Sequence, residues 1–227
     1  MKRILTTASA AFLALGTAAS AATFSLMEDT PGIIPGAGAV NEVLINTFGA
    51  GGAAGYFGAE IYLDEVSDIQ VAAFGFEAGF INEFQMGGQS ITTTQLEAIT
   101  GTTDEAYAAN ETAPLTGFTL NNVASGLLDF SFLTDGNGGG QVDNGDNPDN
   151  GGTNPNFFVS FGKDSMDQVV FLFFDDGGAE NDDNHDDLVI RLSIGDSNTV
   201  PNPVPLPATG LLLLGALGGM RMMKRRS

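Results

Sequence analysis

The chain has 227 residues, no cysteine, no tryptophan and one histidine, and it sets 28 acidic residues against eight basic ones. This composition excludes a disulfide scaffold, a zinc–thiolate site and a basic nucleic-acid-binding protein. Six of the eight cations lie at the two ends, so residues 22–199 keep Lys163 and Arg191 against all 28 anions, a formal charge of −26. A body of that charge repels nucleic acid and anionic lipid surfaces.

Residues 1–21 have the three-part layout of a secretory signal peptide. Lys2 and Arg3 open the segment, an apolar stretch follows, and small residues lead to Ala21, after which we expect cleavage. The apolar part is too short to span a bilayer. The alternative is an ordinary N-terminal helix, whereas the signal peptide predicts an exported protein.

Residues 22–199 are predicted to form one all-β domain, an antiparallel β-sandwich or jelly roll, because short apolar or alternating runs are separated by turns rich in Gly, Asn and Asp. Leu128, Phe130 and Phe132 alternate with polar residues, as do the aliphatic residues of 188–194. The unbroken apolar run 169–174 is typical of a central strand. Further strands are predicted at 23–27, 43–48, 60–63, 69–76, 118–120 and 157–161.

Helix is predicted only at 94–100 and in a second candidate at 104–109, with Thr94 or Thr103 as the capping residue. Residues 135–156 read as a low-complexity loop that is too polar to pack. Its polar residues match no complete calcium-binding repeat, so we expect a disordered loop there rather than a second ion site. They are Asp135, Asn137, Asp143, Asp146 and Asp149.

The 13 residues between the strands 169–174 and 188–194 carry seven carboxylates and neither Lys nor Arg. If the two strands pair, the carboxylates are forced together, and two of them about 6 Å apart repel by about 0.7 kcal/mol even in water. A cation should therefore occupy the turn, and oxygen ligands without sulfur favour Ca²⁺. The predicted ligands are Asp175, Asp176, Glu180, Asp182, Asp183, Asp186 and Asp187.

The turn is not an EF-hand, because Asn181 stands where that loop needs glycine. The alternative to a structural calcium site is a solvated acidic loop. His185 lies among the carboxylates, which favour its charged form, and we expect a solvated surface imidazole rather than a catalytic group. The chain has no phosphate-binding loop, no dinucleotide fingerprint and no Gly-x-Ser-x-Gly elbow, so we predict that it is not an enzyme.

The C-terminal part consists of a Pro-rich linker with a sorting motif at 200–207 and a hydrophobic helix with a basic end at 208–227. The 17 residues from Val204 to Met220 carry no charge and would form a helix about 25 Å long, slightly short of the roughly 30 Å hydrocarbon layer. We expect transient insertion into the inner membrane, with the basic end in the cytoplasm. A permanent anchor is the alternative.

The residues Val204, Pro205, Leu206, Pro207 and Ala208, followed by an apolar segment and a terminal Arg/Lys cluster, resemble the VPLPA-type C-terminal sorting signals of Gram-negative bacteria, relatives of the PEP-CTERM signals. The resemblance implies an exosortase-type membrane protease as a partner. That protease would remove the tail and release the body, or attach it, at the cell surface.

A competing match is the LPxTG pattern of Gram-positive sortase substrates at 206–210, with cleavage between Thr209 and Gly210. The first resemblance also extends to the body, because the acidic turn within 175–194 and the segment 76–84 are similar to stretches of exported PEP-CTERM and VPLPA-type proteins. Those proteins imply a β-rich exported domain without an established reaction.

These observations predict a non-enzymatic cell-surface or extracellular-matrix protein with a calcium-stabilised β-sandwich. An extracellular polysaccharide is the further partner we expect. The alternative is a secreted carbohydrate-binding module with structural calcium, although the absence of Trp and the presence of only Tyr56, Tyr62 and Tyr107 leave few of the aromatic platforms that grip sugar rings.

Overall fold

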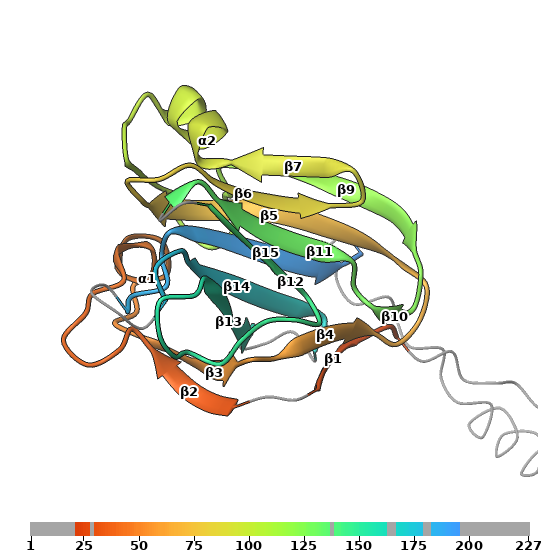
Figure 1. The fold of residues 1–227 in the computed structure, drawn as a ribbon. Helices are drawn as coiled ribbons and strands as arrows, with labels where there is room; N and C mark the ends of the chain where they lie inside the picture. The colour runs from red at the N-terminus through yellow and green to blue at the C-terminus, as the bar shows by residue number, and fades with distance from the viewer. Residues whose placement is uncertain (1–20, 28–29, 137–138, 163–166, 179–182, 196–227) are drawn as a thin grey trace, which may run out of the picture. The chain divides into compact units, whose positions relative to one another are not determined.

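The computed structural model describes residues 21–27, 30–136, 139–162, 167–178 and 183–195 (Figure 1). Ala22–Asn198 form one compact unit. Antiparallel strands dominate its described residues and only two short helices accompany them, so the predicted all-β class is confirmed. The predicted signal peptide, apart from Ala21, and the linker and tail at 200–227 lie outside the described residues. Within those residues, no helix has the length and apolar character needed to cross a membrane.

The largest sheet has eight strands, all paired antiparallel. In spatial order it runs β2 (Thr30–Ile34), β3 (Ala53–Phe57), β13 (Asn156–Phe161), β14 (Val169–Asp175), β15 (Leu188–Ile194), β5 (Ser67–Glu77) and β8 (Glu105–Tyr107), and β9 (Thr116–Val123) also pairs with β5. This sheet confirms the strands predicted near 69–76, 118–120, 157–161, 169–174 and 188–194.

Two smaller sheets complete the domain. One contains β12 (Gly140–Asp143), β11 (Phe130–Thr134), β6 (Asn82–Met86) and β7 (Gln89–Thr92), and the other contains β1 (Phe24–Met27), β4 (Glu60–Leu63) and β10 (Gly126–Leu127). The main hydrophobic core joins residues of all three sheets. In it, Phe132 of β11 stacks on Phe174 of β14 with ring centroids 4.7 Å apart. The opposite face of the large sheet carries a second apolar cluster, on which Val43 and Leu44 pack.

Those two residues belong to helix α1 (Glu42–Phe48), so the strand predicted at 43–48 is wrong. Asn41 caps the helix by accepting the Leu44 N–H at 2.7 Å, and Gly49 ends it in the left-handed region at φ 63°. A short apolar run does not by itself distinguish a strand from a buried helix, and here the two flanking cap residues decide.

The second helix, α2 (Thr93–Thr100), confirms the helix predicted at 94–100. Its N-cap is Thr92, in a capping box with Gln95, rather than Thr94. The helix predicted at 104–109 is wrong, because residues 105–107 form β8 at the edge of the large sheet and bury Ala106.

The segment 135–156 is more ordered than its composition predicts. Within its described part, Val142 of β12 pairs with Phe132 and is buried in the main core. Asn144 is also buried and accepts the Ile61 N–H at 2.8 Å, and Asn147 accepts the Phe157 N–H at 3.0 Å. Side-chain amides thus take the place of backbone partners, which is how so polar a segment packs.

Candidate metal centre

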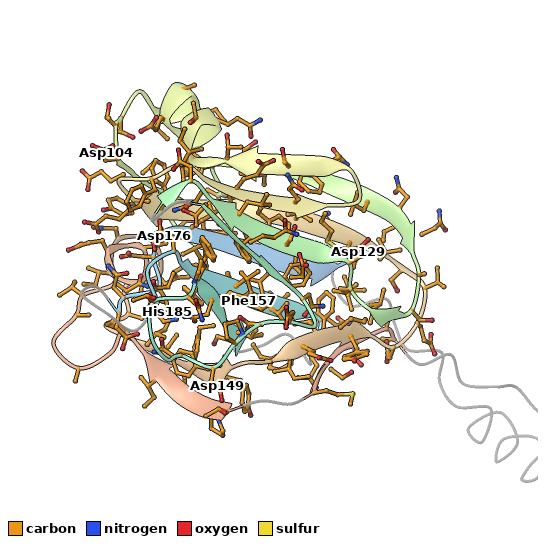
Figure 2. All side chains as sticks on the ribbon, viewed as in Figure 1. Asp104, Asp129, Asp149, Phe157, Asp176 and His185 are labelled. Atoms are coloured by element: carbon orange, nitrogen blue, oxygen red, sulfur yellow. The ribbon has the colours of Figure 1, made fainter. Side chains whose placement is uncertain are left out.

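The acidic turn joins β14 to β15, which pair from Val169↔Ser193 to Phe174↔Leu188. The pairing on which the sequence argument depended is therefore present. Asp176 and His185 lie toward the same end of the domain as helix α1 (Figures 1 and 2). Asn41, the N-cap of α1, connects the helix to the turn, because its Nδ2 donates to the carbonyl oxygens of Asn184 at 2.7 Å and His185 at 3.0 Å.

The structure separates the seven predicted ligands. Asp175 and Asp183 lie together with His185, and this is the one group of three potential metal ligands within the described residues. Glu180 and Asp182 lie outside those residues. The described acids of the 135–156 segment do not join any such group, and Asn137 is not among the described residues.

The other three predicted ligands accept hydrogen bonds that hold the turn. Asp186 Oδ2 accepts the Glu42 N–H at 2.7 Å, at the first turn of α1. Asp176 Oδ2 accepts from Asn82 Nδ2 at 2.8 Å, and Asp187 Oδ2 accepts the Asp176 N–H at 2.7 Å. Their density in sequence therefore reflects the construction of the turn as well as any ion.

The prediction that His185 is a solvated surface imidazole is wrong. His185 is fully buried, its backbone is left-handed at φ 59°, and its ring packs near Phe57 and Phe158 with centroids 5.4 and 6.3 Å away. Burial lowers the pKa of His185 to about 3, so its imidazole is neutral at physiological pH. The neighbouring carboxylates do not keep the imidazole protonated, because the aromatic rings around it exclude water.

A hydrogen bond to Asn156 fixes which ring nitrogen carries the proton. His185 Nε2 lies 2.8 Å from Asn156 Oδ1, and an amide oxygen only accepts, so Nε2 donates and Nδ1 keeps a lone pair. Asn156 opens β13 directly opposite Asp175 at the end of β14. The large sheet thus places the orienting amide and one carboxylate side by side.

The lone pair of His185 Nδ1 faces two carboxylates. Nδ1 lies 3.5 Å from Asp175 Oδ2 and 3.5 Å from Asp183 Oδ1. Asp175 is 1 % exposed, and both its Oδ2 and His185 Nδ1 are buried without a hydrogen-bond partner among the described residues. The three ligand atoms lie within 4.8 Å of one another, and a cation between them would pair with all three.

Both carboxylates are held in place through their other contacts. Asp175 Oδ1 accepts the N–H groups of Gly177 at 2.9 Å and Gly178 at 2.6 Å, which leaves Oδ2 directed at the histidine. Asp183 Oδ1, the oxygen that faces His185, also accepts from Asn150 Nδ2 at 2.8 Å. A Cβ atom on Gly36 would overlap Asp183 Oδ2, so only glycine at position 36 leaves room for this carboxylate.

The electrostatics of the cluster agree with its geometry. Burial raises the pKa of Asp175 to about 7 against the lowering effect of the Gly177 and Gly178 N–H groups, and the charges of Asp176 and Asp183 raise it further. Burial and the charge of Asp176 also raise the pKa of Asp187 well above its usual value. The sequence between Asp175 and Asp187 contains no Lys or Arg that would offset these charges.

One imidazole nitrogen and two carboxylate oxygens form a donor set suited to Zn²⁺ or Mn²⁺. Calcium takes six to eight oxygen ligands, so the histidine is not the ligand that the calcium prediction required. Sequence reasoning missed His185 as a ligand, although its position two residues after Asp183 in an acid-rich turn was an available signal. The sequence contains no signal that points to Asn156, which is 29 residues away.

The chain matches no protein-family model, and it shows no significant similarity to a curated protein or to a solved structure.

Proposed function

We propose that this protein is an exported, non-enzymatic β-sandwich of the jelly-roll kind, in which Asp175, Asp183 and His185 bind one structural divalent cation at the β14–β15 turn. The observation that carries the proposal is the buried lone pair of His185 Nδ1, 3.5 Å from both carboxylates. The cation would join the end of β14 to a turn that also contacts α1 and β13, and would so fasten three parts of the chain.

The burial of the cluster supports a structural role over catalysis. His185 and Asp175 are 0 % and 1 % exposed, and of the three ligands only the Asp183 side chain, 30 % exposed, reaches solvent. A structural site is closed in this way, whereas a catalytic site keeps an open coordination position. The nitrogen ligand favours Zn²⁺ or Mn²⁺, and the calcium predicted from the sequence is the competing ion.

The proposal includes export with cleavage after Ala21, which the sequence pattern of residues 1–21 supports. A domain that begins at Ala22 would keep the contacts of its first strand. Gln168 Nε2 donates to the Ala22 carbonyl at 3.2 Å, and Phe24 N–H donates to Asp167 O at 2.7 Å. Thr23 donates to Asp64 through its N–H at 2.6 Å and its hydroxyl at 2.8 Å.

The proposal includes the fate of the C-terminal tail. An exosortase-type protease would remove it at the VPLPA-like motif after transient insertion into the inner membrane, and the body would reach the cell surface or the medium. The sequence motif alone supports this part.

Three measurements on protein purified from its native cells test the proposal. Elemental analysis should give one Zn or Mn per chain, and intact mass should show an N-terminus at Ala22 and a missing tail. Thermal unfolding should occur at higher temperature in Zn²⁺ or Mn²⁺ than in EDTA, since an ion at a hundred times its dissociation constant adds about 2.7 kcal/mol. One calcium per chain would reinstate the sequence prediction, whereas metal-free protein with equal melting curves would remove the metal centre.

A further inference from the structure

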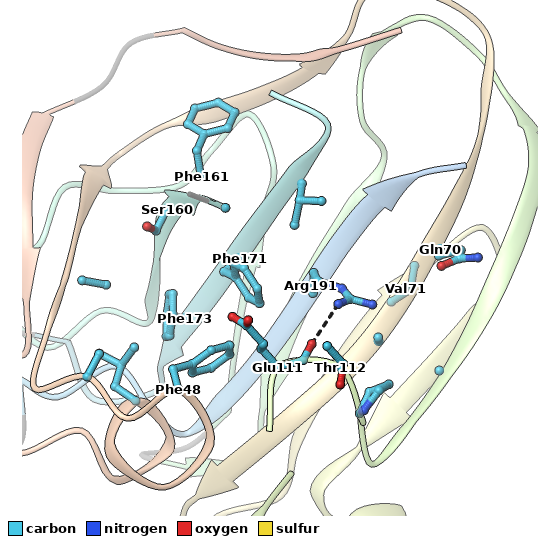
Figure 3. Close-up of a pocket in the computed structure, with 18 of the residues that line it drawn as sticks. Phe48, Gln70, Val71, Glu111, Thr112, Ser160, Phe161, Phe171, Phe173 and Arg191 are labelled. Atoms are coloured by element: carbon cyan, nitrogen blue, oxygen red, sulfur yellow. Dashed lines mark hydrogen bonds between the residues drawn. The ribbon is translucent and has the colours of Figure 1, made fainter. Parts of the chain in front are cut away.

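A groove of about 1050 Å³ lies on the outer face of the large sheet, away from the main core (Figure 3). Its lining comes from six strands that are neighbours in the sheet, from β3 through β13, β14, β15 and β5 to β9. At a strand spacing of about 4.8 Å, six strands extend over about 24 Å. The groove is therefore long in the direction that crosses the strands, a shape that fits an extended chain.

The floor stays open because small residues stand where the sheet would otherwise fill it. Ala54 on β3, Ala72 on β5 and Gly117 on β9 all line the groove. Helix α1 covers one part of this face, and its residue Phe48 contacts Phe171 of β14 with ring centroids 5.1 Å apart. The face is thus partly covered by the chain and partly left as a groove.

Phenyl rings and hydrogen-bonding groups both line the groove. Phe48 and Phe171 are half-buried and belong to its face of the sheet, whereas Phe161, also half-buried, packs against the main core. Ser160 lies at one end of the groove, near Phe161, and Gln70 lies at the other end, beyond Arg191 (Figure 3). Aromatic faces with polar groups at their edges suit a ligand that itself has apolar faces and polar edges, as a sugar ring does.

The net charge of the groove lining differs from that of the whole domain. Its lining contains one cation, Arg191, and one anion, Glu111, in a domain that carries 28 acids. The Arg191 guanidinium lies 4.9 Å over the Phe74 ring, and Nη1 donates to the Glu111 carbonyl at 3.2 Å. No carboxylate among the described residues forms a salt bridge with it. The negative charge of the domain would repel an acidic polymer, and the lining offers a basic polymer only one carboxylate, Glu111, so the groove suits an uncharged ligand.

From this shape and charge we infer that the groove binds an uncharged polysaccharide chain, with sugar rings stacked on Phe48 and Phe171 and hydroxyl groups bonded to Arg191 and Glu111. An aliphatic ligand would leave the polar groups of the lining unpaired. The inference does not depend on the metal centre, because none of the three ligands proposed there lines the groove.

Titration of the full-length, metal-replete protein with neutral hexasaccharides tests this inference. Cellohexaose, maltohexaose and mannohexaose are the probes, with hexagalacturonate and an acidic peptide as charged comparisons. At least one neutral hexasaccharide should bind, and Phe171→Ala and Arg191→Gln should each weaken it about tenfold, the effect of losing about 1.4 kcal/mol of stacking or hydrogen bonding. Leu127→Ala, an exposed apolar position on β10, is the matched control and should leave the affinity unchanged.

Amide NMR shifts of the wild-type protein keep the test decisive should a variant unfold. The bound hexasaccharide should perturb residues 70–72, 117–119 and 160–162 and leave β10 unperturbed. Failure of all three neutral probes to bind, binding that neither variant weakens, or binding of only the acidic probes would overturn the inference.

Discussion

Asn156 Oδ1 accepts a hydrogen bond from His185 Nε2 at 2.8 Å, and this one contact places the lone pair of the histidine between two aspartates. The two residues are 29 positions apart in sequence. They meet because β13 begins opposite the end of β14, where Asp175 stands. The register of the large sheet therefore decides the chemistry of the turn.

Replacing that amide should weaken metal binding more than it weakens the fold. Asn156→Leu keeps the volume but leaves the Nε2–H buried without a partner, so we expect a loss of about 1–3 kcal/mol in unfolding free energy. Metal affinity should fall about ten- to hundredfold, as for other groups that orient a ligand histidine. Asn147→Leu is the control, because Asn147 is also buried and hydrogen bonded but contacts Phe157 instead. Calorimetric titration of both variants should separate them, and equal metal affinities would argue against the role of Asn156.

A methyl group at position 36 should displace one ligand. In Gly36→Ala the new Cβ overlaps Asp183 Oδ2, so the carboxylate must turn away from His185. We expect metal affinity to fall by at least about tenfold, the usual cost of disturbing ligand orientation. Gly51→Ala adds the same methyl group into open space and should bind metal like the wild type. Unchanged affinity in Gly36→Ala would show that Asp183 is not a ligand.

The contact between α1 and the turn should contribute to stability. Asn41→Ala removes the helix N-cap and the two bonds to the carbonyls of Asn184 and His185, and we expect a loss of about 2 kcal/mol in urea unfolding. Asn46→Ala, on the exposed side of the same helix, should change the unfolding free energy by less than about 0.5 kcal/mol. Similar losses in both variants would mean that the turn does not depend on α1.

A substitution in the hydrophobic core next to the turn should lower the unfolding free energy by more. Phe132 is fully buried and stacks on Phe174, the residue before Asp175. Phe132→Ala should lower the unfolding free energy by about 3–5 kcal/mol. Phe80→Ala, at a ring that is 43 % exposed, should cost much less in the same urea titration. A loss below about 1 kcal/mol for Phe132→Ala would contradict the assigned packing between β11 and β14.

Strand periodicity predicted much of this fold, and it failed where a short run carried no period of its own. The alternation in 188–194 and the apolar run 169–174 gave β15 and β14 and their pairing. Residues 43–48 looked like a strand, although Asn41 and Gly49 are recognisable as a helix cap and stop. Polar composition misled in 135–156, because Asn144 and Asn147 pack through bonds to the backbone of distant segments.

The sequence predicted where the candidate site lies, but not which residues form it. The density of carboxylates located the turn, and two of the seven predicted ligands, Asp175 and Asp183, lie in the cluster. The burial of His185 could not be predicted, because its ring is enclosed by Phe57 and Phe158, which come from other strands. Only the folded sheet reveals a histidine without water around it.

Titration of the full-length, chelator-treated protein and of its His185→Asn variant with Zn²⁺ and Mn²⁺ would show whether His185 binds a metal ion. Asparagine tolerates the left-handed backbone of position 185 and removes the Nδ1 ligand. We expect one ion bound per wild-type chain and no ion bound at this site in the variant, with the variant still folded. No uptake by the wild type, or equal uptake by both proteins, would contradict it.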